Sequence, residues 1–516
     1  MLVWLPWAIT AGVFLGLFVV IAAIMFFLSH KEERSPIAIV AATAVIFLIM
    51  ACIAIVPADI YNTSHSDLSI VEERAYIVEI IYYVLYSLVI VTTFIVVPFC
   101  FFYSESFLDD DTSVKKRLWN GFKFTIFFCV ILVVLLVIGL FLRSDSFPSG
   151  TDKEQWQQYI HNLYEDSSMI ESSIAFTVFC LSILGYAIWL TYTSYGMTVW
   201  ALNLIKGRKR VDSEIRDTEA ELAKIKQMQT HFDKNTKRGK KQYEDYKQKE
   251  IYLEEKLKAL GKLTGGCRFF AQLFVPFKIL IGFGVLGFSA FILVSIVITQ
   301  VNRLIDSDCT FKCGFIMTED PTIPNPIDML LTILSKYYPL DYIAFSVIVL
   351  FLVAVTAFAL MSLGVRLVWV KLYNVGFKRT TAQALVSASL MLVLSILVLN
   401  TQLLNIAPQY VTYGSRTYVN QNNETVSCGM NATISAMSPV ADADEASASF
   451  DTPCPMSTLA TIFNQLYSGM GFFGIVFYIA TWAWVIAVGI FFALGIFWCR
   501  KSNVMTEEEM IEDEFL

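Results

Sequence analysis

Long apolar runs recur along this chain and define its predicted elements. About nine of them have the roughly twenty residues that a helix needs to cross a 30 Å hydrocarbon core. The predicted spans are Val3–Leu28, Pro36–Val56, Ala75–Phe102, Phe124–Leu142, Ser173–Thr191, Ile279–Thr299, Ile343–Val365, Ala384–Leu404 and Gly471–Trp498. None shows the ten-residue alternation of polar and apolar positions that is typical of a membrane β-barrel. The pattern predicts an all-α polytopic membrane protein with about nine transmembrane helices.

Composition supports this fold class and excludes several others. Of the 516 residues, 56% are hydrophobic and 16% are charged, whereas soluble domains have about 45–50% and about 25%. The net charge of −7 argues against nucleic acid as a partner. No Lys or Arg precedes the first apolar run, and that run is much longer than the core of a signal peptide. We therefore expect the first run to be retained as a membrane helix.

The positive charges predict the orientation in the membrane. Most of the 38 Lys and Arg residues fall in cytosolic loops if the N-terminus is lumenal and the C-terminus cytosolic. Three N-glycosylation sequons then lie on the lumenal side, at Asn62, Asn423 and Asn431. Four cysteines lie there too: Cys309, Cys313, Cys428 and Cys454. These allow three pairings, of which we favour the local ones, Cys309–Cys313 and Cys428–Cys454.

This orientation divides the chain into six regions. They are a five-span membrane region (1–202), a basic cytosolic hairpin (203–275), a three-span membrane region (276–408), a glycosylated lumenal loop (409–466), the last span (467–499) and an acidic cytosolic tail (500–516). The lumenal loop is polar and low in complexity, which is typical of a protective glycosylated cap. Recognition of a lumenal ligand is the alternative role for it.

Apolar positions at helical spacing predict the hairpin. One series comprises Val211, Ile215, Leu222 and Ile225, with Thr218 completing it, and a second comprises Tyr243, Tyr246, Leu253, Leu257 and Leu260. The turn-forming stretch FDKNTKRGKK separates them. Each arm would be about 30 Å long. Such a hairpin suits a docking surface for a partner, and it equally suits an intramolecular link between two halves.

Catalytic and metal-binding motifs are missing from the sequence. It contains no GxxxxGK[ST] loop for ATP, no HExxH and no GxSxG, and its four histidines are scattered over different loops. We therefore predict no enzyme activity, no catalytic residue and no metal site. Any uphill movement of a solute would draw on an ion gradient or on a partner.

One polar stripe inside the membrane is a candidate ligand pathway. Glu79, Tyr82, Tyr83 and Tyr86 follow one another at i, i+3, i+4 and i+7, so they share a helical face. An acidic residue in a span is a candidate for a pathway or proton relay, and tyrosines can stack on a large planar solute. The alternative is an interfacial carboxylate beside the ordinary aromatic belt. Asn400, in the eighth predicted span, also has two alternative roles: it contacts a ligand, or it forms a hydrogen bond between helices.

A short apolar stretch precedes the seventh span. The sequence MLLTILSKYYPLDYI begins at Met329 and is too short to cross the membrane. It predicts either a re-entrant element or a segment that lies in the membrane interface.

Four segments carry a resemblance to a known family. They are LDDDTS (Leu108–Ser113), TYTSYGMTVWALNLIKG (Thr191–Gly207), YPLDYI (Tyr338–Ile343) and APQYVTYGS (Ala407–Ser415). In this order they closely resemble segments of the limb-region membrane protein family. The second is the most specific, because its order of Tyr, Gly, Asn and Lys has no generic membrane explanation. The loop lengths and the acidic tail match less well.

The resemblance implies a function. Members of this kind are nine-span lysosomal membrane proteins required to export cobalamin to the cytosol, as the transporter or as the escort of an ATP-binding-cassette transporter. Cobalamin would then be cargo rather than a cofactor, and the resemblance transfers no catalytic residues. Two other functions remain open: an endocytic receptor for a lipocalin-like ligand, working through the lumenal loops, and a membrane-anchored signalling scaffold, working through the hairpin.

Overall fold

The computed structural model describes 19, 21–26, 29, 35–64, 68–106, 114–141, 169–206, 211–229, 247, 249–250, 253–254, 257–258, 275–306, 321–367, 370–376, 380–419, 425–428, 454–469 and 471–497. All structural statements below concern these residues. The predicted disulfide pair Cys309–Cys313 and the sequons at Asn423 and Asn431 lie outside them, as does the acidic tail.

Eight helices in this described part of the chain are long and apolar enough to cross a membrane. They are Pro36–Thr63, Arg74–Glu105, Val114–Phe141, Ser173–Lys206, Pro276–Ile305, Leu340–Leu363, Ala382–Ile406 and Phe472–Phe497. Each overlaps one of the last eight predicted spans, which confirms the all-α polytopic membrane fold. The first predicted span, Val3–Leu28, lies mostly outside the described residues.

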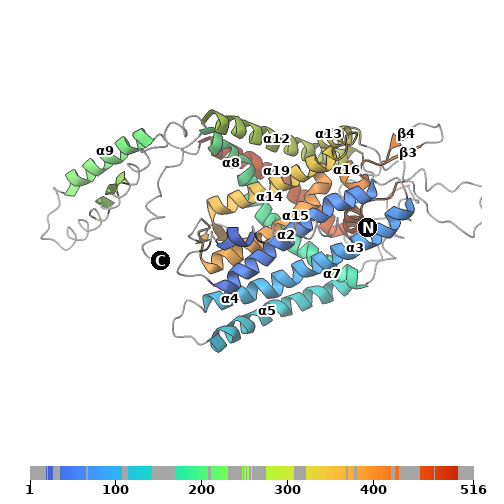
Figure 1. The fold of residues 1–516 in the computed structure, drawn as a ribbon, viewed down its shortest axis with the longest axis horizontal. Helices are drawn as coiled ribbons and strands as arrows, with labels where there is room; N and C mark the ends of the chain where they lie inside the picture. Colours follow the sequence, from blue (N-terminus) through green and yellow to red (C-terminus); the bar gives the residue numbers. More distant parts are fainter. Residues whose placement is uncertain are drawn as a thin grey trace, which may run out of the picture. The chain divides into compact units, whose positions relative to one another are not determined.

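Figure 1 shows how these elements follow one another. The first half contains α2 (Pro36–Thr63), α3 (Leu68–Val91), the π-helix η1 (Thr92–Val96), α4 (Val97–Glu105), α5 (Val114–Phe141), α7 (Met169–Ile188), the π-helix η2 (Trp189–Thr193), α8 (Ser194–Lys206) and α9 (Val211–Gln229). The second half contains α12 (Val275–Ile305), α13 (Pro326–Leu334), α14 (Leu340–Leu363), α15 (Ala382–Ile406), α16 (Pro408–Tyr413), α18 (Thr458–Gly469) and α19 (Gly471–Phe497).

Two small antiparallel ribbons interrupt the helical fold. Strand β1 (Val365–Leu367) pairs with β2 (Val370–Tyr373), and β3 (Thr417–Val419) pairs with β4 (Thr425–Ser427). The sequence analysis predicted neither ribbon. Each is only three or four residues per strand, so a hydrophobic pattern is too short to reveal it.

The chain forms two compact units. The first comprises Met1–Met197 and Ala290–Gly489, and the second comprises Thr198–Ser289 and Ile490–Leu516. In the first unit, α15 lies at the centre and packs against α2, α4, α7 and α14. The close approach to α7 needs Gly185, because a Cβ atom there would overlap the backbone carbonyl oxygen of Leu394.

The span predicted over Ser173–Thr191 is too short, since the helical segment continues to Lys206. The prediction ended at the polar run TYTSY, in which Tyr192, Thr193 and Tyr195 form hydrogen bonds inside the protein. Tyr192 Oη donates to Gly364 O at 3.0 Å and accepts from Arg366 N at 2.9 Å. Thr193 and Thr356 share a hydroxyl–hydroxyl bond of 2.8 Å. The most family-like segment of the sequence therefore joins this helix to α14 and β1.

In the second unit, the helical hairpin is confirmed where it is described. Helix α9 buries Thr218 and Ile225, and the residues described on the second arm are helical, with Leu253 4% exposed. Lys226 Nζ lies 2.9 Å from Glu254 Oε1, which joins the two arms. Ile215, Leu222 and Leu257 are half-buried. The side chain of Val211 and the residues Tyr243, Tyr246 and Leu260 lie outside the described part.

Candidate functional site

The predicted stripe on α3 does not act as one surface. Tyr82 and Tyr86 are buried, at 1% and 3% exposure, whereas Glu79 and Tyr83 are half-buried. The carboxyl group of Glu171 interacts electrostatically with both Glu79 and Tyr83. The structure thus separates the stripe into an inward-facing tyrosine pair and a more open side near a second carboxyl group.

The tyrosine pair contacts an acidic residue that the sequence analysis missed. Tyr82 Oη donates to Asp59 Oδ2 at 3.4 Å, and the rings of Tyr82 and Tyr86 are 5.8 Å apart. Asn400 Nδ2 donates to Tyr86 Oη at 3.4 Å. Tyr82, Tyr86 and Asn400 are therefore brought together, with Asp59 in place of Glu79. Asn400 makes a helix–helix hydrogen bond, which is one of the two roles expected for it.

Asp59 also anchors the start of α18. Its Oδ1 accepts from Thr458 N at 3.1 Å and its Oδ2 accepts from Leu459 N at 2.8 Å. These are first-turn N–H groups, which have no partner within the helix and favour a carboxylate. Asp59 was missed because the predicted span ended at Val56, which left Asp59 in a loop. Helix α2 continues to Thr63, so Asp59 lies within a membrane span.

A second acidic residue holds α16 in the same way. Asp328 Oδ1 accepts from Tyr410 N at 2.9 Å, and its Oδ2 accepts from Gln409 N at 3.3 Å. Burial raises the pKa of Asp328 to about 7, and the two backbone N–H groups only partly oppose that shift. A third carboxyl group, that of Asp341, accepts from Tyr410 Oη at 2.9 Å.

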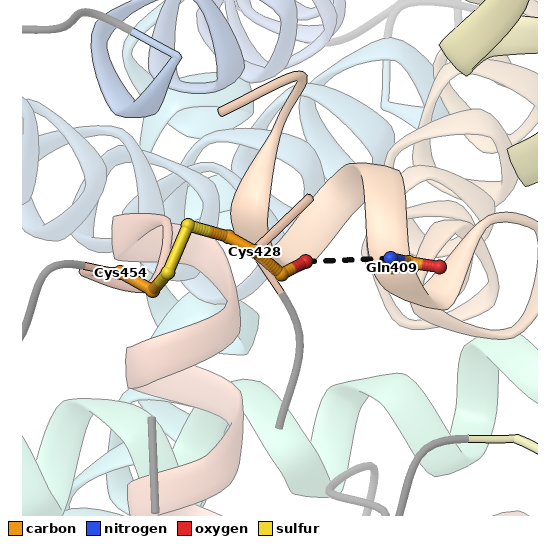
Figure 2. Close-up of a disulfide and its surroundings, with 3 residues drawn as sticks. All are labelled: Gln409, Cys428 and Cys454. Atoms are coloured by element: carbon orange, nitrogen blue, oxygen red, sulfur yellow. Dashed lines mark hydrogen bonds between the residues drawn. A yellow bond between two sulfur atoms is a disulfide. The ribbon is translucent and has the colours of Figure 1, made fainter. Parts of the chain in front are cut away.

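These three carboxyl groups hold one structural piece, which we call the cap. It consists of α16, β3, β4 and α18, and it is closed by a disulfide between Cys428 and Cys454, both buried. Figure 2 shows this bridge, with Gln409 Nε2 donating to Cys428 O at 3.3 Å. The bridge is the second of the two local pairings favoured from the sequence. Ser457 N donates to Thr412 O at 2.7 Å and joins the two ends of the cap.

A chain of amide side chains crosses the centre of the first unit. Gln300 Nε2 donates to Asn405 Oδ1 at 3.0 Å, and Asn405 Nδ2 donates to Gln402 Oε1 at 3.2 Å. Gln402 Nε2 in turn donates to Tyr186 Oη at 2.9 Å and Thr481 Oγ1 at 3.1 Å. These hydrogen bonds connect helices α12, α15, α7 and α19. Polar groups of this kind hold membrane helices together.

The stretch before the seventh span forms α13, which is neither a span nor a free loop. Asn325 caps its start, accepting from Ile327 N at 2.9 Å and donating to Ile406 O at 3.1 Å. Ile327 and Leu331 are fully buried, while Met329 and Ile333 are 60% and 48% exposed. A nine-residue helix with apolar side chains on both faces suits the membrane interface.

The structure disfavours a sugar at the Asn62 sequon. Asn62 is 5% exposed, and its Nδ2 atom, to which a glycan would be attached, donates to Val71 O at 3.3 Å. A glycan added before folding would prevent this burial. Glycosylation at Asn62, Asn423 and Asn431 stays a prediction, and the burial of Asn62 argues against it at that position.

Comparisons with known proteins place the chain among relatives of the same length. A family profile described as LMBR1-like membrane protein matches residues 7–262. The chain is 32% identical to a protein of Dictyostelium discoideum named probable lysosomal cobalamin transporter, over 97% of each chain. The chain belongs to the LMBR1-like membrane protein family. This confirms the resemblance to the limb-region proteins.

Other LMBR1-like relatives are more distant. The lysosomal cobalamin transport escort protein LMBD1 of Gallus gallus is 26% identical, over 94% of this chain and 92% of its own. A probable lysosomal cobalamin transporter of Nematostella vectensis is 27% identical, over 98% and 95%. No solved structure matches the chain.

Proposed function

We propose that this LMBR1-like protein acts in the export of cobalamin from the lysosome to the cytosol. The observation that carries the proposal is the relationship over 97% of both chains to a protein named for lysosomal cobalamin transport. Relatives named as escorts match over nearly the same length. The protein would be a multi-pass component of the lysosomal membrane, with its N-terminus lumenal and its C-terminus cytosolic.

The geometry favours an escort over a transporter. A transporter needs polar groups that face a path for its cargo. The polar side chains of α15 instead bond to neighbouring helices, as Asn400 does to Tyr86 and Gln402 to Tyr186 and Thr481. The sequence also has no P-loop. We therefore propose that the cargo is moved by an ATP-binding-cassette partner and that this chain supports that partner.

The hairpin of the second unit supports the same role. Its inner side is apolar and its outer side is charged, with Arg216, Asp217 and Glu221 exposed. Such a hairpin offers a rigid, water-facing surface for a cytosolic domain of a partner.

The first experiment measures labelled cobalamin in lysosomes of cells that lack the protein. We expect accumulation, and we expect re-expression of the wild-type chain to clear it. Normal lysosomal cobalamin in the deficient cells would contradict the proposal and favour the receptor function.

A second experiment separates the escort from the transporter. Replacing both Leu253 and Leu257 with Asp should disrupt the packing between the arms, so the partner should be mislocalised or inactive while the membrane region folds. Glu79→Gln and Tyr83→Ala should leave release unchanged. Impaired release in these two variants, with normal folding and targeting, would support a transporter instead.

A further inference from the structure

Three tyrosines at the ends of membrane helices form a cluster that no part of the proposed function uses. Tyr61 lies near the end of α2, Tyr338 lies in the turn after α13, and Tyr342 lies at the start of α14. We call these three residues the tyrosine cluster. Tyr61 and Tyr338 are 40% and 74% exposed. This exposure distinguishes them from the buried aromatic core around Phe179, which is 1% exposed.

The three rings are inclined to one another rather than stacked. The ring centroids of Tyr61 and Tyr342 are 5.7 Å apart at 70°, and those of Tyr338 and Tyr342 are 6.1 Å apart at 68°. Tyr61 and Tyr338 are 6.5 Å apart at 50°. A cation held by several aromatic faces lies within about 6 Å of each ring centroid. Three inclined rings at these separations can therefore present their faces to one cation.

The base of the cluster is fixed, and an acidic residue, Asp341, lies beside it. The Tyr342 hydroxyl interacts with the side chains of Ser64 and Ser415. Ser64 Oγ also donates to Ile60 O at 2.8 Å and accepts from Ser415 N at 3.1 Å. The adjacent Asp341 is 2% exposed and interacts electrostatically with Tyr342. A carboxyl group behind the rings strengthens the attraction of a cation.

The surroundings indicate that the cation belongs to a lipid. Tyr61 and Tyr342 lie in the last and first turns of membrane-spanning helices, where lipid headgroups are found. Met329, Leu330 and Ile333 of the adjoining α13 are exposed apolar side chains, which suits contact with acyl chains. Lys336 is exposed in the same turn as Tyr338 and can contact a phosphate.

We propose that the tyrosine cluster binds the quaternary ammonium group of a phosphatidylcholine headgroup in the leaflet that adjoins α13. The trimethylammonium group is weakly hydrated and is held by aromatic faces. The primary ammonium group of phosphatidylethanolamine is strongly hydrated and gains less from them. Lys336 contacts the phosphate, which both lipids carry. The site therefore selects the choline headgroup rather than any zwitterionic lipid.

The test uses the full-length protein, purified in detergent. Its melting temperature is measured with short-chain diheptanoyl phosphatidylcholine, and separately with diheptanoyl phosphatidylethanolamine and diheptanoyl phosphatidylglycerol. We expect the choline lipid to raise the melting temperature most, at the lowest concentration. Soluble phosphocholine in excess should reduce this shift, because it competes for the same rings.

Variants decide whether the cluster causes the selectivity. Tyr61→Leu and Tyr338→Leu should abolish the preference for the choline lipid, whereas Tyr338→Phe should keep it because the ring remains. Tyr337→Leu is the matched control, since Tyr337 is 67% exposed in the same turn but lies outside the cluster. Lys336→Gln should weaken binding of the choline and ethanolamine lipids alike.

Two results would overturn the proposal. One is equal stabilisation of the wild type by all three lipids. The other is an equal loss of preference in Tyr337→Leu and Tyr338→Leu, which would reduce the cluster to part of a general aromatic belt. If Tyr61→Leu does not fold, Tyr338→Leu and Tyr338→Phe still decide the outcome, because Tyr338 is exposed in a turn.

Discussion

Helices α15 and α5 are apolar spans of similar length, with 25 and 28 residues, but they occupy opposite environments. Within the most apolar 18-residue window of each, 72% of the α15 residues are buried and 11% of the α5 residues. On α5 the buried residues are Gly121, Thr125 and Gly139. Its other side chains are half-buried or exposed, as Val133 is at 58% exposure.

The difference between the two helices lies in their polar residues. Helix α15 carries Asn400, Gln402 and Asn405 in its last two turns, and all three are 1% exposed or less. Lipid tails are as apolar as the side chains, so an apolar side chain gains little free energy when it moves from lipid into the protein interior. Burial in a membrane is driven instead by close packing and by hydrogen bonds between helices. Helix α15, which carries these buried amide side chains, is therefore the central helix of the first unit, whereas α5 is peripheral.

Disrupting the close packing of α7 against α15 is expected to reduce the stability of the protein the most. Gly185→Leu places atoms where the carbonyl oxygen of Leu394 lies, and overpacking of this kind costs about 3 kcal/mol. We expect a marked fall in the melting temperature of the purified protein. Gly489→Leu on α19 is the control, because a Cβ atom there meets nothing within 4 Å. Equal losses in both variants would mean that α7 does not pack on α15 as described.

The carboxyl group of Asp328, which binds the first turn of α16 directly after α15, gives the next effect, which depends on pH. Burial raises the pKa of Asp328 to about 7 in the folded protein, from an ordinary value of 3.8. The folded state therefore binds this proton more tightly than the unfolded state, and stability falls as the pH rises towards 7. Proton linkage predicts a loss of about 2 kcal/mol between about pH 5 and about pH 7.

Thermal unfolding of Asp328→Asn across this pH range measures that contribution. The variant lacks the titrating group, so its melting temperature should fall less between pH 5 and pH 7 than that of the wild type. Tyr337→Leu, which changes an exposed residue near the same helix, should keep the wild-type slope. A slope unchanged in Asp328→Asn would show that Asp328 titrates alike in both states.

Removing one amide side chain from α15 is expected to reduce the stability of the protein by a smaller amount. Gln402→Leu loses the hydrogen bonds to Tyr186 and Thr481, which is worth about 1 kcal/mol in a membrane interior. We expect a modest fall in melting temperature. Val133→Leu on the outward face of α5 should have no effect. If Gln402→Leu instead stabilises the protein, the amide chain serves function at the expense of stability.

A substitution in the water-facing hairpin is expected to change the melting temperature the least. Lys226 pairs with Glu250 and Glu254 on the hairpin, where all three are solvent-accessible. Water and salt screen such pairs, so Lys226→Gln should leave the melting temperature of the protein unchanged. A clear loss would show that charge rather than the apolar side of the hairpin holds its arms together.

Much of the fold could be predicted from the sequence. Eight predicted spans overlap membrane helices, and the described part of the hairpin is helical. Membrane helices need long apolar runs, and the hairpin needs apolar positions at helical spacing, so both are visible in the sequence. The errors occurred where polar residues continue a helix. Asp59 and the run from Thr191 to Tyr195 read as ends of spans, yet α2 and the helical segment to Lys206 contain them. Asp59, Tyr192 and Thr193 bond to partners that lie far away in the sequence.

The candidate site was predicted only in part. Tyr82 and Tyr86 lie together as the spacing suggested, and the structure adds Asn400 to them, but helical spacing also grouped Glu79 and Tyr83 with the pair. Spacing identifies which residues share a face and does not show which neighbour covers it. The carboxyl group beside Tyr82 comes from Asp59, 23 residues earlier, on another helix.

The membrane class, the number of later spans and the family can be inferred from the amino-acid sequence, because each depends on local composition or on order along the chain. The tertiary structure alone decided that α15 is central and α5 peripheral. It also decided that Asp59, Asp328 and Asp341 hold the cap and that Tyr61, Tyr338 and Tyr342 meet. The physical reason is that a buried polar group needs a partner, and in this protein those partners come from distant segments.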